Sequence, residues 1–316
     1  MRISVIVCTY RRVDDVRRLL ECLRGQTFGD FEVLVVEGIE AGTSVPRASA
    51  DFGLSGDGHF NLKVLAAPLG LPHQRNVGMR EACGELLCFL DDDVTVERTF
   101  LEQISDLFAQ PAMRDVGGLT GYDVRNYPQP ITWRWRLRRW LRTVPTLQPG
   151  SADRLGRNVP LSFASPSAAC HAVGWLAGFC MAYRRAAIAE QRFDEGLPTY
   201  GGEDRDFSLR VGQRWRLVLC GSVRVQHHTS PGARVSDLRR VFESGFGMGR
   251  GFAKRLRGIP DYLSAVRYLC CEFLIDALAF AAHPTGKHRG VGFARARGFV
   301  TGFRSVGTQG RRSAYV

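Results

Sequence analysis

The sequence Glu85-Leu-Leu-Cys-Phe-Leu-Asp-Asp-Asp93 joins a short apolar run directly to three consecutive carboxylates. Such a run is typical of a strand buried on both faces of a parallel sheet. Three adjacent carboxylates repel one another unless a cation or protons offset their charge. We therefore expect a buried strand that carries a site for a hard divalent ion, Mg²⁺ or Mn²⁺, at its carboxyl end.

Strand and helix patterns alternate before this segment. Apolar runs predict strands over 3–8, 31–36 and 63–66. Helical spacing predicts a helix after the first run, with Asp14 as its cap, a loop rich in Gly and Ser is expected over 38–58, and a second helix is expected over 73–83. This order predicts an α/β fold with an open, mostly parallel sheet and flanking helices, whose ligands bind at the carboxyl ends of the strands. Thr9, Glu37 and Asp91 fall at such ends.

The later part of the chain is less regular. We expect an irregular segment over 125–167, a strand over 175–183 and two short strands, 216–219 and 223–226, before a pair of histidines. Helices and a tail rich in Gly and Arg follow. The predicted organisation is a catalytic domain over 1–235 and a helical, basic C-terminal extension over 236–316.

The composition indicates a globular protein with an anionic partner. Of its 316 residues 45% are hydrophobic, and 43 Lys and Arg against 31 Asp and Glu give a net charge of +12. The basic aromatic run 133–140 and the apolar segment 262–282 fit contact with an anionic membrane surface, whereas Arg267, Glu272 and Asp276 argue against a spanning helix.

The cysteines and the N-terminus predict a location. There are nine cysteines without a C-x-x-C pair, so we expect no disulfide framework and a reducing compartment. The first apolar run ends before Arg11, which is too short for a secretory signal. We expect a cytoplasmic protein, peripheral at the inner face of the membrane.

Four motifs in order resemble those of family 2 glycosyltransferases with the GT-A fold. They cover about residues 1–230 and are Ser4-Val-Ile-Val-Cys-Thr-Tyr-Arg-Arg12, Gln74-Arg-Asn-Val-Gly78, Phe89-Leu-Asp-Asp-Asp93 and Gly202-Glu-Asp-Arg-Asp-Phe207. The resemblance implies a Rossmann-like nucleotide-binding half. It also implies inverting transfer of a sugar from a UDP-, GDP- or dTDP-linked donor to a hydroxyl acceptor, such as a glycan, a small molecule or a lipid-linked acceptor.

The resemblance also assigns the donor site. It places Asp93 on the metal, completed by one of the two histidines, His227 or His228. The residues that it places around the donor nucleotide are Thr9, Tyr10, Arg12, Glu37, Arg75, Asp91 and Asp92. Glu37 departs from the family, which usually has Asp here, and this leaves the nucleobase open.

The acceptor side is assigned in the same way. The resemblance implies that Asp204, with Glu203 as second choice, is the general base that removes the proton of the acceptor hydroxyl. Trp175 and Gly178 belong to a segment that resembles the floor of the acceptor site, where Trp175 stacks on a sugar or packs in the core.

Two other functions fit parts of the sequence. Phe89-Leu-Asp-Asp-Asp-Val-Thr95 also matches the strand motif of haloacid-dehalogenase-like phosphatases, but that family has this strand near its N-terminus and a Lys before its later acidic pair. Here Lys63 precedes the motif and Lys254 follows the acids. A basic nucleic-acid-binding protein would explain the charge but not the acidic triplet, so no nucleic-acid partner is expected.

Overall fold

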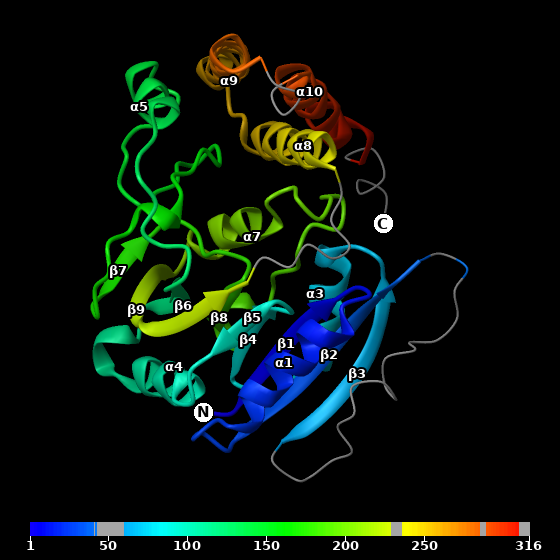
Figure 1. Cartoon of the computed structure of the whole chain (residues 1–316), viewed down its shortest axis with the longest axis vertical. Helices are drawn as coiled ribbons and strands as arrows, with labels where there is room; N and C mark the ends of the chain where they lie inside the picture. The colour runs from blue at the N-terminus through cyan, green and yellow to red at the C-terminus, as the bar shows by residue number, and fades with distance from the viewer. Residues whose placement is uncertain (41, 43–59, 229–235, 285–288, 310–316) are drawn as a thin grey trace.

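The computed structural model describes residues 1–40, 42, 60–228, 236–284 and 289–309. In this part of the chain a nine-stranded sheet has the order β3-β2-β1-β4-β8-β6-β9-β5, and β7 pairs with β9 (Figure 1). The strands are β1 (Ile3–Thr9), β2 (Phe31–Ile39), β3 (Asn61–Pro68), β4 (Leu86–Asp91), β5 (Val94–Val96), β6 (Val116–Asp123), β7 (Cys170–Val173), β8 (Cys180–Arg184) and β9 (Arg216–His227).

Helices cover both faces of the sheet and gather at one end of the molecule (Figure 1). They are α1 (Val13–Arg24), α3 (Leu71–Glu81), α4 (Phe100–Ala109), α5 (Trp133–Trp140), α6 (Arg185–Ile188), α7 (Glu203–Val211), α8 (Asp237–Arg255), α9 (Ile259–Ala282) and α10 (Val291–Gln309). No helix in the described part of the chain is both long and apolar enough to cross a bilayer.

The parallel half of the sheet confirms the predicted α/β fold. β3, β2, β1 and β4 run parallel and are joined through α1 and α3. Side chains of β1 alternate between two cores: Val5 and Val7 pack with α1, and Ile6 packs against α3. β1 is buried along its whole length, which is why its sequence is apolar without interruption.

Four details differ from the sequence-based expectations. Arg12, not Asp14, is the N-cap of α1, and it makes no side-chain capping bond. Residues 133–140 form a helix inside the segment expected to be irregular. The strand expected over 175–183 begins only at Cys180, as β8, because the chain turns before it. The two short strands expected over 216–219 and 223–226 form one strand, β9, whose register against β6 shifts along its length.

The structure also contains a disulfide, although the cysteine pattern predicted no disulfide framework and a reducing compartment. Cys170 of β7 and Cys220 of β9 form one, because these antiparallel strands place the two residues directly opposite each other. The two cysteines are 50 residues apart in the sequence, so no local spacing of cysteines indicates the pair. The inference of a reducing compartment loses the support that it drew from the cysteines.

The C-terminal helices have a small core of their own. Phe252 of α8, Ala265 of α9 and Phe299 of α10 pack together with Leu155. The predicted boundary at residue 236 follows residues 229–235, which lie outside the described residues, as does most of the loop expected after β2.

Candidate active site

The carboxyl ends of β1, β2 and β4 meet at one edge of the sheet. Thr9 lies opposite Glu37 in the β1–β2 register, and Cys8 lies opposite Asp91 in the β1–β4 register. The three residues predicted at strand ends therefore share this edge. Buried Gln74 of α3 fastens it, because its Nε2 donates to the carbonyl of Thr9 at 2.7 Å and to that of Val36 at 2.9 Å.

Asp92, the middle residue of the triplet, is only 4% exposed. Its carboxylate accepts hydrogen bonds from Thr9 Oγ1 at 2.7 Å and from Arg12 Nη1 at 2.9 Å. Burial raises the pKa of Asp92 to about 7, although Arg12 and Thr9 act in the opposite direction. Asp92 thus holds the loop after β1 against the triplet.

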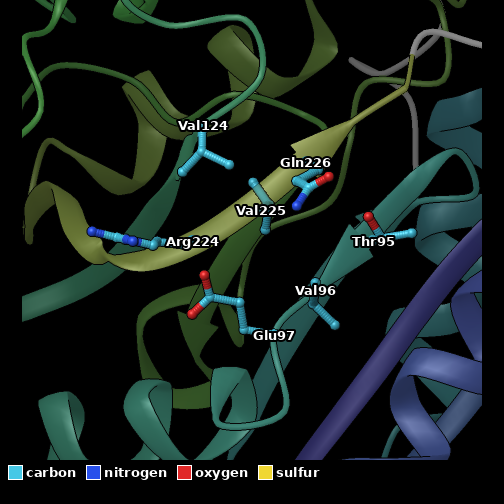
Figure 2. A pocket seen from close by; sticks show the side chains of 7 residues that line it. All are labelled: Thr95, Val96, Glu97, Val124, Arg224, Val225 and Gln226. Atoms are coloured by element: carbon cyan, nitrogen blue, oxygen red, sulfur yellow. The ribbon is translucent and has the colours of Figure 1, made fainter.

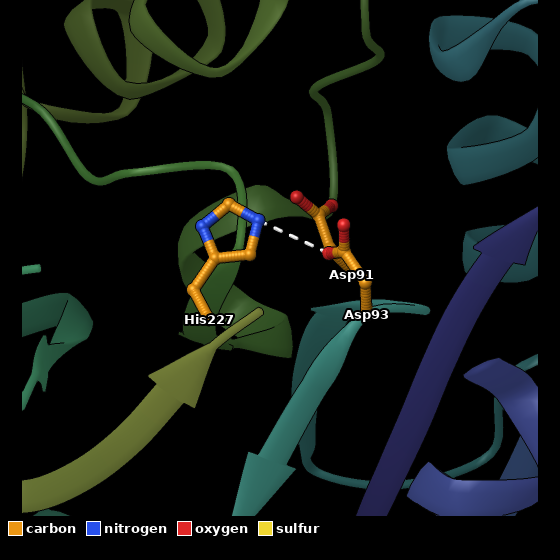
Figure 3. Close-up of side chains that lie close together, drawn as sticks. All are labelled: Asp91, Asp93 and His227. Atoms are coloured by element: carbon orange, nitrogen blue, oxygen red, sulfur yellow. Dashed lines mark ion pairs between the residues drawn. The ribbon is translucent and has the colours of Figure 1, made fainter. Parts of the chain in front are cut away.

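Asp91, Asp93 and His227 form a compact group of possible metal ligands (Figure 3). Their ligand atoms all lie within 4.8 Å of one another, and His227 Nε2 is 3.0 Å from Asp93 Oδ1. The histidine reaches Asp93 because β5 pairs with β9, with Val94 opposite His227. Two carboxylates and one imidazole are a suitable donor set for a divalent ion.

The electrostatics of this group fit a cation. Burial raises the pKa of Asp91, although Arg75 and His227 partly offset this effect. Burial lowers the pKa of His227, but its hydrogen bond to Asp93 and the charge of Asp91 outweigh burial and raise it overall. The carboxylates thus favour a positive charge at this position, which a metal ion would supply in place of the proton.

His228 lies outside this group. Its Nε2 is 2.9 Å from Thr95 Oγ1, and its Nδ1 is 3.0 Å from Arg125 Nη1. Of the two histidines that the sequence left open, the structure brings His227 to the triplet. Phe179 stacks on the His227 ring, with the two centroids 5.3 Å apart.

Arg75 of α3 connects the end of β4 with the start of α7. It is 2% exposed, and its guanidinium lies 2.8 Å from Glu203 Oε1, 3.5 Å from Asp91 Oδ1 and 3.0 Å from the carbonyl oxygen of Gly178. A buried arginine needs such partners, because an unpaired charge there is strongly destabilising. Arg75 therefore fixes the start of α7 relative to the end of β4.

The two candidate bases have different surroundings. Glu203 is 5% exposed and paired with Arg75, and burial and the charge of Asp204 raise its pKa. Asp204 is half-buried, and its Oδ2 accepts from the backbone N–H of Gly178 at 2.9 Å. A Cβ at Gly178 would lie 3.0 Å from Arg75 Nη2 and 3.3 Å from Asp204 Oδ2, so the packing here favours glycine.

The remaining predicted residues lie around this edge. The Tyr10 hydroxyl donates to Glu40, and Glu37 is half-buried at the end of β2. Trp175 is also half-buried: it packs against the sheet core, and its Nε1 donates to the carbonyl of Val159 at 3.1 Å. Its ring thus has a structural role whether or not a sugar contacts it.

Three residues that shape the site were not assigned a role from the sequence. Gln74 joins two strand ends, Phe179 supports the His227 ring, and Asp123 accepts from the His227 backbone N–H at 3.3 Å. Asp123 is 1% exposed and ends β6. A single acidic residue at a strand end carries no signal in the sequence, because its partner lies 104 residues further along.

A separate small hollow lies between β5 and β9 (Figure 2). Its volume is about 60 Å³, and Glu97 and Arg224 are among its lining residues. Sites for small molecules have volumes of roughly 300–1,000 Å³. The hollow is therefore too small for a nucleotide sugar.

Comparisons with known proteins agree with this architecture. Two solved structures share the fold: the mannosyltransferase PcManGT from Pyrobaculum calidifontis, in complex with GDP-Man and Mn²⁺, and TarS 1-349 from S. aureus, in complex with UDP-GlcNAc. The first has a TM-score of 0.58 at 15% identity, over 96% of this chain and 87% of that one. The second has a TM-score of 0.52 at 15% identity, over 99% and 92%. The fold is thus of the GT-A type.

Curated relatives match a shorter segment. A glucosyl-dolichyl phosphate glucuronosyltransferase from Haloferax volcanii is 31% identical over 122 residues, which are 37% of this chain and 38% of that protein. The putative glycosyltransferase EpsH from Bacillus subtilis is 29% identical over 125 residues, 40% of this chain and 33% of that protein. The matched segments span about a third of the length of these relatives.

The family comparison covers more of the chain. The sequence model described as "Glycosyl transferase family 2" matches residues 4–190, from β1 through α6. This range includes the acidic triplet and Arg75. Since the match extends over more than half of the 316 residues, the chain belongs to glycosyl transferase family 2.

Proposed function

We propose that this protein is an inverting, metal-assisted glycosyltransferase that uses a nucleotide-diphosphate-sugar donor. The observation that carries the proposal is the group of Asp91, Asp93 and His227 at the carboxyl edge of a GT-A sheet. Support comes from the family and from two structural neighbours, solved with GDP-Man and Mn²⁺ and with UDP-GlcNAc. UDP, GDP and dTDP remain the candidate nucleotides.

The donor set favours Mn²⁺ over Mg²⁺ as the ion. Asp91 and Asp93 offer carboxylate oxygens, which suit both ions, whereas His227 adds an imidazole nitrogen, which suits a softer ion than Mg²⁺. Such an ion would offset the negative charge of the departing nucleoside diphosphate. Thr9, Tyr10, Arg12 and Glu37 are proposed to line the nucleoside side, with Asp92 holding the end of β1 and the loop after it in place.

Asp204 is proposed as the general base. In a single displacement the acceptor oxygen attacks the anomeric carbon, the bond to the diphosphate oxygen breaks, and the carboxylate takes the proton of the hydroxyl. Glu203 is held in a buried ion pair with Arg75, whereas Asp204 is more accessible and accepts a hydrogen bond from the Gly178 N–H, which orients its carboxylate. Trp175 and Gly178 then belong to the acceptor side.

The acceptor is proposed to be a lipid-linked hydroxyl compound at the cytoplasmic face of a membrane. The support is the exposed basic and aromatic helix α5, in which Trp140 is 76% exposed. A relative from Haloferax volcanii is named for a dolichyl phosphate substrate, which is consistent with an acceptor of this class.

Calorimetry of nucleotide binding tests the metal. We expect UDP, GDP or dTDP to bind with Mn²⁺ present and to lose affinity in EDTA, and Asp93→Ala to abolish the metal-dependent part. His228→Ala is the matched control, because this residue lies outside the ligand group. A protein that binds one of these nucleotides equally well in chelator would exclude a metal role in donor binding.

A further inference from the structure

The helices α5, α9 and α10 lie together at one end of the molecule, and α8 and α7 lie between them and the sheet (Figure 1). None of the residues assigned above to the donor site lies on α5, α9 or α10. Its surface has an unusual distribution of apolar and charged residues, which is clearest on the longest helix, α9.

The amphipathic pattern of α9 is inverted. Of its four charged residues, Asp261, Glu272 and Asp276 are buried and Arg267 is exposed. The inward face also carries apolar residues of different sizes, among them Ala265, Tyr268 and Ile275. Large apolar side chains, between 39% and 65% exposed, occupy the outer face: Tyr262, Leu263, Val266, Phe273, Leu274, Leu278 and Phe280.

Ion pairs fix this orientation. Arg138 of α5 donates to Glu272 from Nε at 2.6 Å, and Arg295 of α10 donates to Asp276 from Nε at 2.7 Å. Arg154 pairs with Asp261 near the start of α9. Rotating α9 to hide its apolar face would separate these partners and leave buried charges unpaired, which is strongly destabilising.

The neighbouring helices extend the same surface. Trp140 of α5 is 76% exposed and Phe293 of α10 is 73% exposed. α5 and α10 contain no acidic residue, and the acidic residues of α9 are buried. Every exposed charged side chain on these three helices is therefore an arginine, as in Arg136, Arg139 and Arg297.

We propose that this end of the molecule docks on an anionic lipid bilayer, with α9 lying in the interface. Acyl chains would cover the outer face of α9, the tryptophans would lie at the boundary, and the arginines would contact the anionic headgroups. A second copy of the chain is a poorer occupant, because a two-fold interface would bring these arginines close to one another.

Docking itself does not depend on the transfer chemistry. One consequence rests on the proposed function: docking would place α7, which begins with Glu203 and Asp204, on the side of the sheet nearer the membrane, with α8 between α7 and the docking helices (Figure 1). A lipid-linked acceptor would then meet the enzyme at the bilayer surface. This placement would therefore make a lipid-linked compound the expected class of acceptor.

Vesicle flotation of the full chain tests the proposal. We expect the protein to float with vesicles of phosphatidylglycerol and phosphatidylcholine and to float much less with phosphatidylcholine alone. Salt should release it from the anionic vesicles, because the Debye length falls from about 30 Å at 0.01 M to about 3 Å at 1 M. A chain that stays unbound with anionic vesicles at low salt would overturn the proposal.

Variants locate the contact. Leu263→Asn combined with Leu274→Asn should lower vesicle affinity at least about tenfold, since two large apolar contacts are lost. Leu238→Asn on α8, where Leu238 is 46% exposed, is the control and should bind like the unchanged protein. Arg136→Glu with Arg139→Glu should remove the preference for anionic lipid.

Two outcomes argue against the bilayer. If the double leucine variant binds vesicles like the unchanged protein, α9 is not the contact. If sedimentation shows a concentration-dependent dimer that this variant abolishes, a second copy covers the face instead. Calorimetry of nucleotide diphosphate binding should be unaltered in all these variants, which separates a failure of docking from a failure of the proposed function.

Discussion

At the scale of single residues, Glu203 and Asp204 are neighbours with different surroundings. Glu203 is held in a buried ion pair with Arg75, whereas Asp204 is half-buried and bonded to the Gly178 backbone. Asp204→Asn keeps the shape of the side chain but removes its basicity. We expect turnover to fall by about 10²–10⁴-fold while calorimetry shows unchanged donor binding.

Glu203→Gln is the matched comparison. Because it weakens the partner of Arg75, we expect a smaller loss of turnover together with a lower free energy of unfolding. Equal losses of turnover in both variants would show that the two carboxylates act as a unit. Full turnover in both, with donor and acceptor saturating, would place the base elsewhere.

At the scale of elements, an ion-pair network joins α8 to the segment before α7. Asp194 pairs with Arg250, with its Oδ2 at 2.6 Å from Nε, and also with Lys254. Burial alone would raise the pKa of Asp194, but the hydrogen bonds from Arg250 and Lys254 outweigh burial and lower it. Its contribution to stability is therefore present above the ordinary aspartate pKa and is lost as pH falls through the folded value.

Asp194→Asn should thus lower the free energy of unfolding at neutral pH, by about 1–3 kcal/mol. The free energy of unfolding of this variant should also fall less steeply between about pH 5 and pH 2 than that of the unchanged protein. Urea unfolding at several pH values measures both effects. Asp115→Asn is the control, because the Asp115–Arg216 pair is exposed. An equally steep pH dependence in Asp194→Asn would rule out this role.

The disulfide between β7 and β9 gives a second prediction at this scale. It closes a loop with a sequence separation of 50 residues, for which a stabilisation of about 2–4 kcal/mol is usual. Reduction should therefore lower the melting temperature, and Cys220→Ala should remove the effect of reductant. Cys270→Ser, at an exposed free cysteine, should keep it. A melting temperature insensitive to reductant would contradict the prediction.

At the scale of the whole molecule, donor binding should stabilise the fold, because strand ends and α7 converge on one site. A ligand at 100 times its Kd contributes about 2.7 kcal/mol, which for a chain of this length corresponds to a rise in Tm of roughly 4 °C. We expect one of the UDP, GDP and dTDP sugars to give the largest rise with Mn²⁺, and EDTA to reduce it. No rise with any of them would contradict the proposed donor class.

The sequence alone determined the features that have a local period. Continuous apolar runs identified β1, β2 and β4, and helical spacing identified α1 and α3. From their alternation followed the parallel half of the sheet and the placement of Thr9, Glu37 and Asp91 at one edge. These predictions hold because strand and helix periods depend on which faces of an element are buried.

Only the tertiary structure decided the pairings between distant segments. The β5–β9 register brought His227 to Asp93 and left His228 beside Thr95, a choice that two adjacent histidines cannot show. The Cys170–Cys220 disulfide and the outward apolar face of α9 also depend on partners far along the chain. Helical periodicity identifies two faces, but the buried partners of Glu272 and Asp276 determine which one faces inward, because unpaired charges are excluded from the interior.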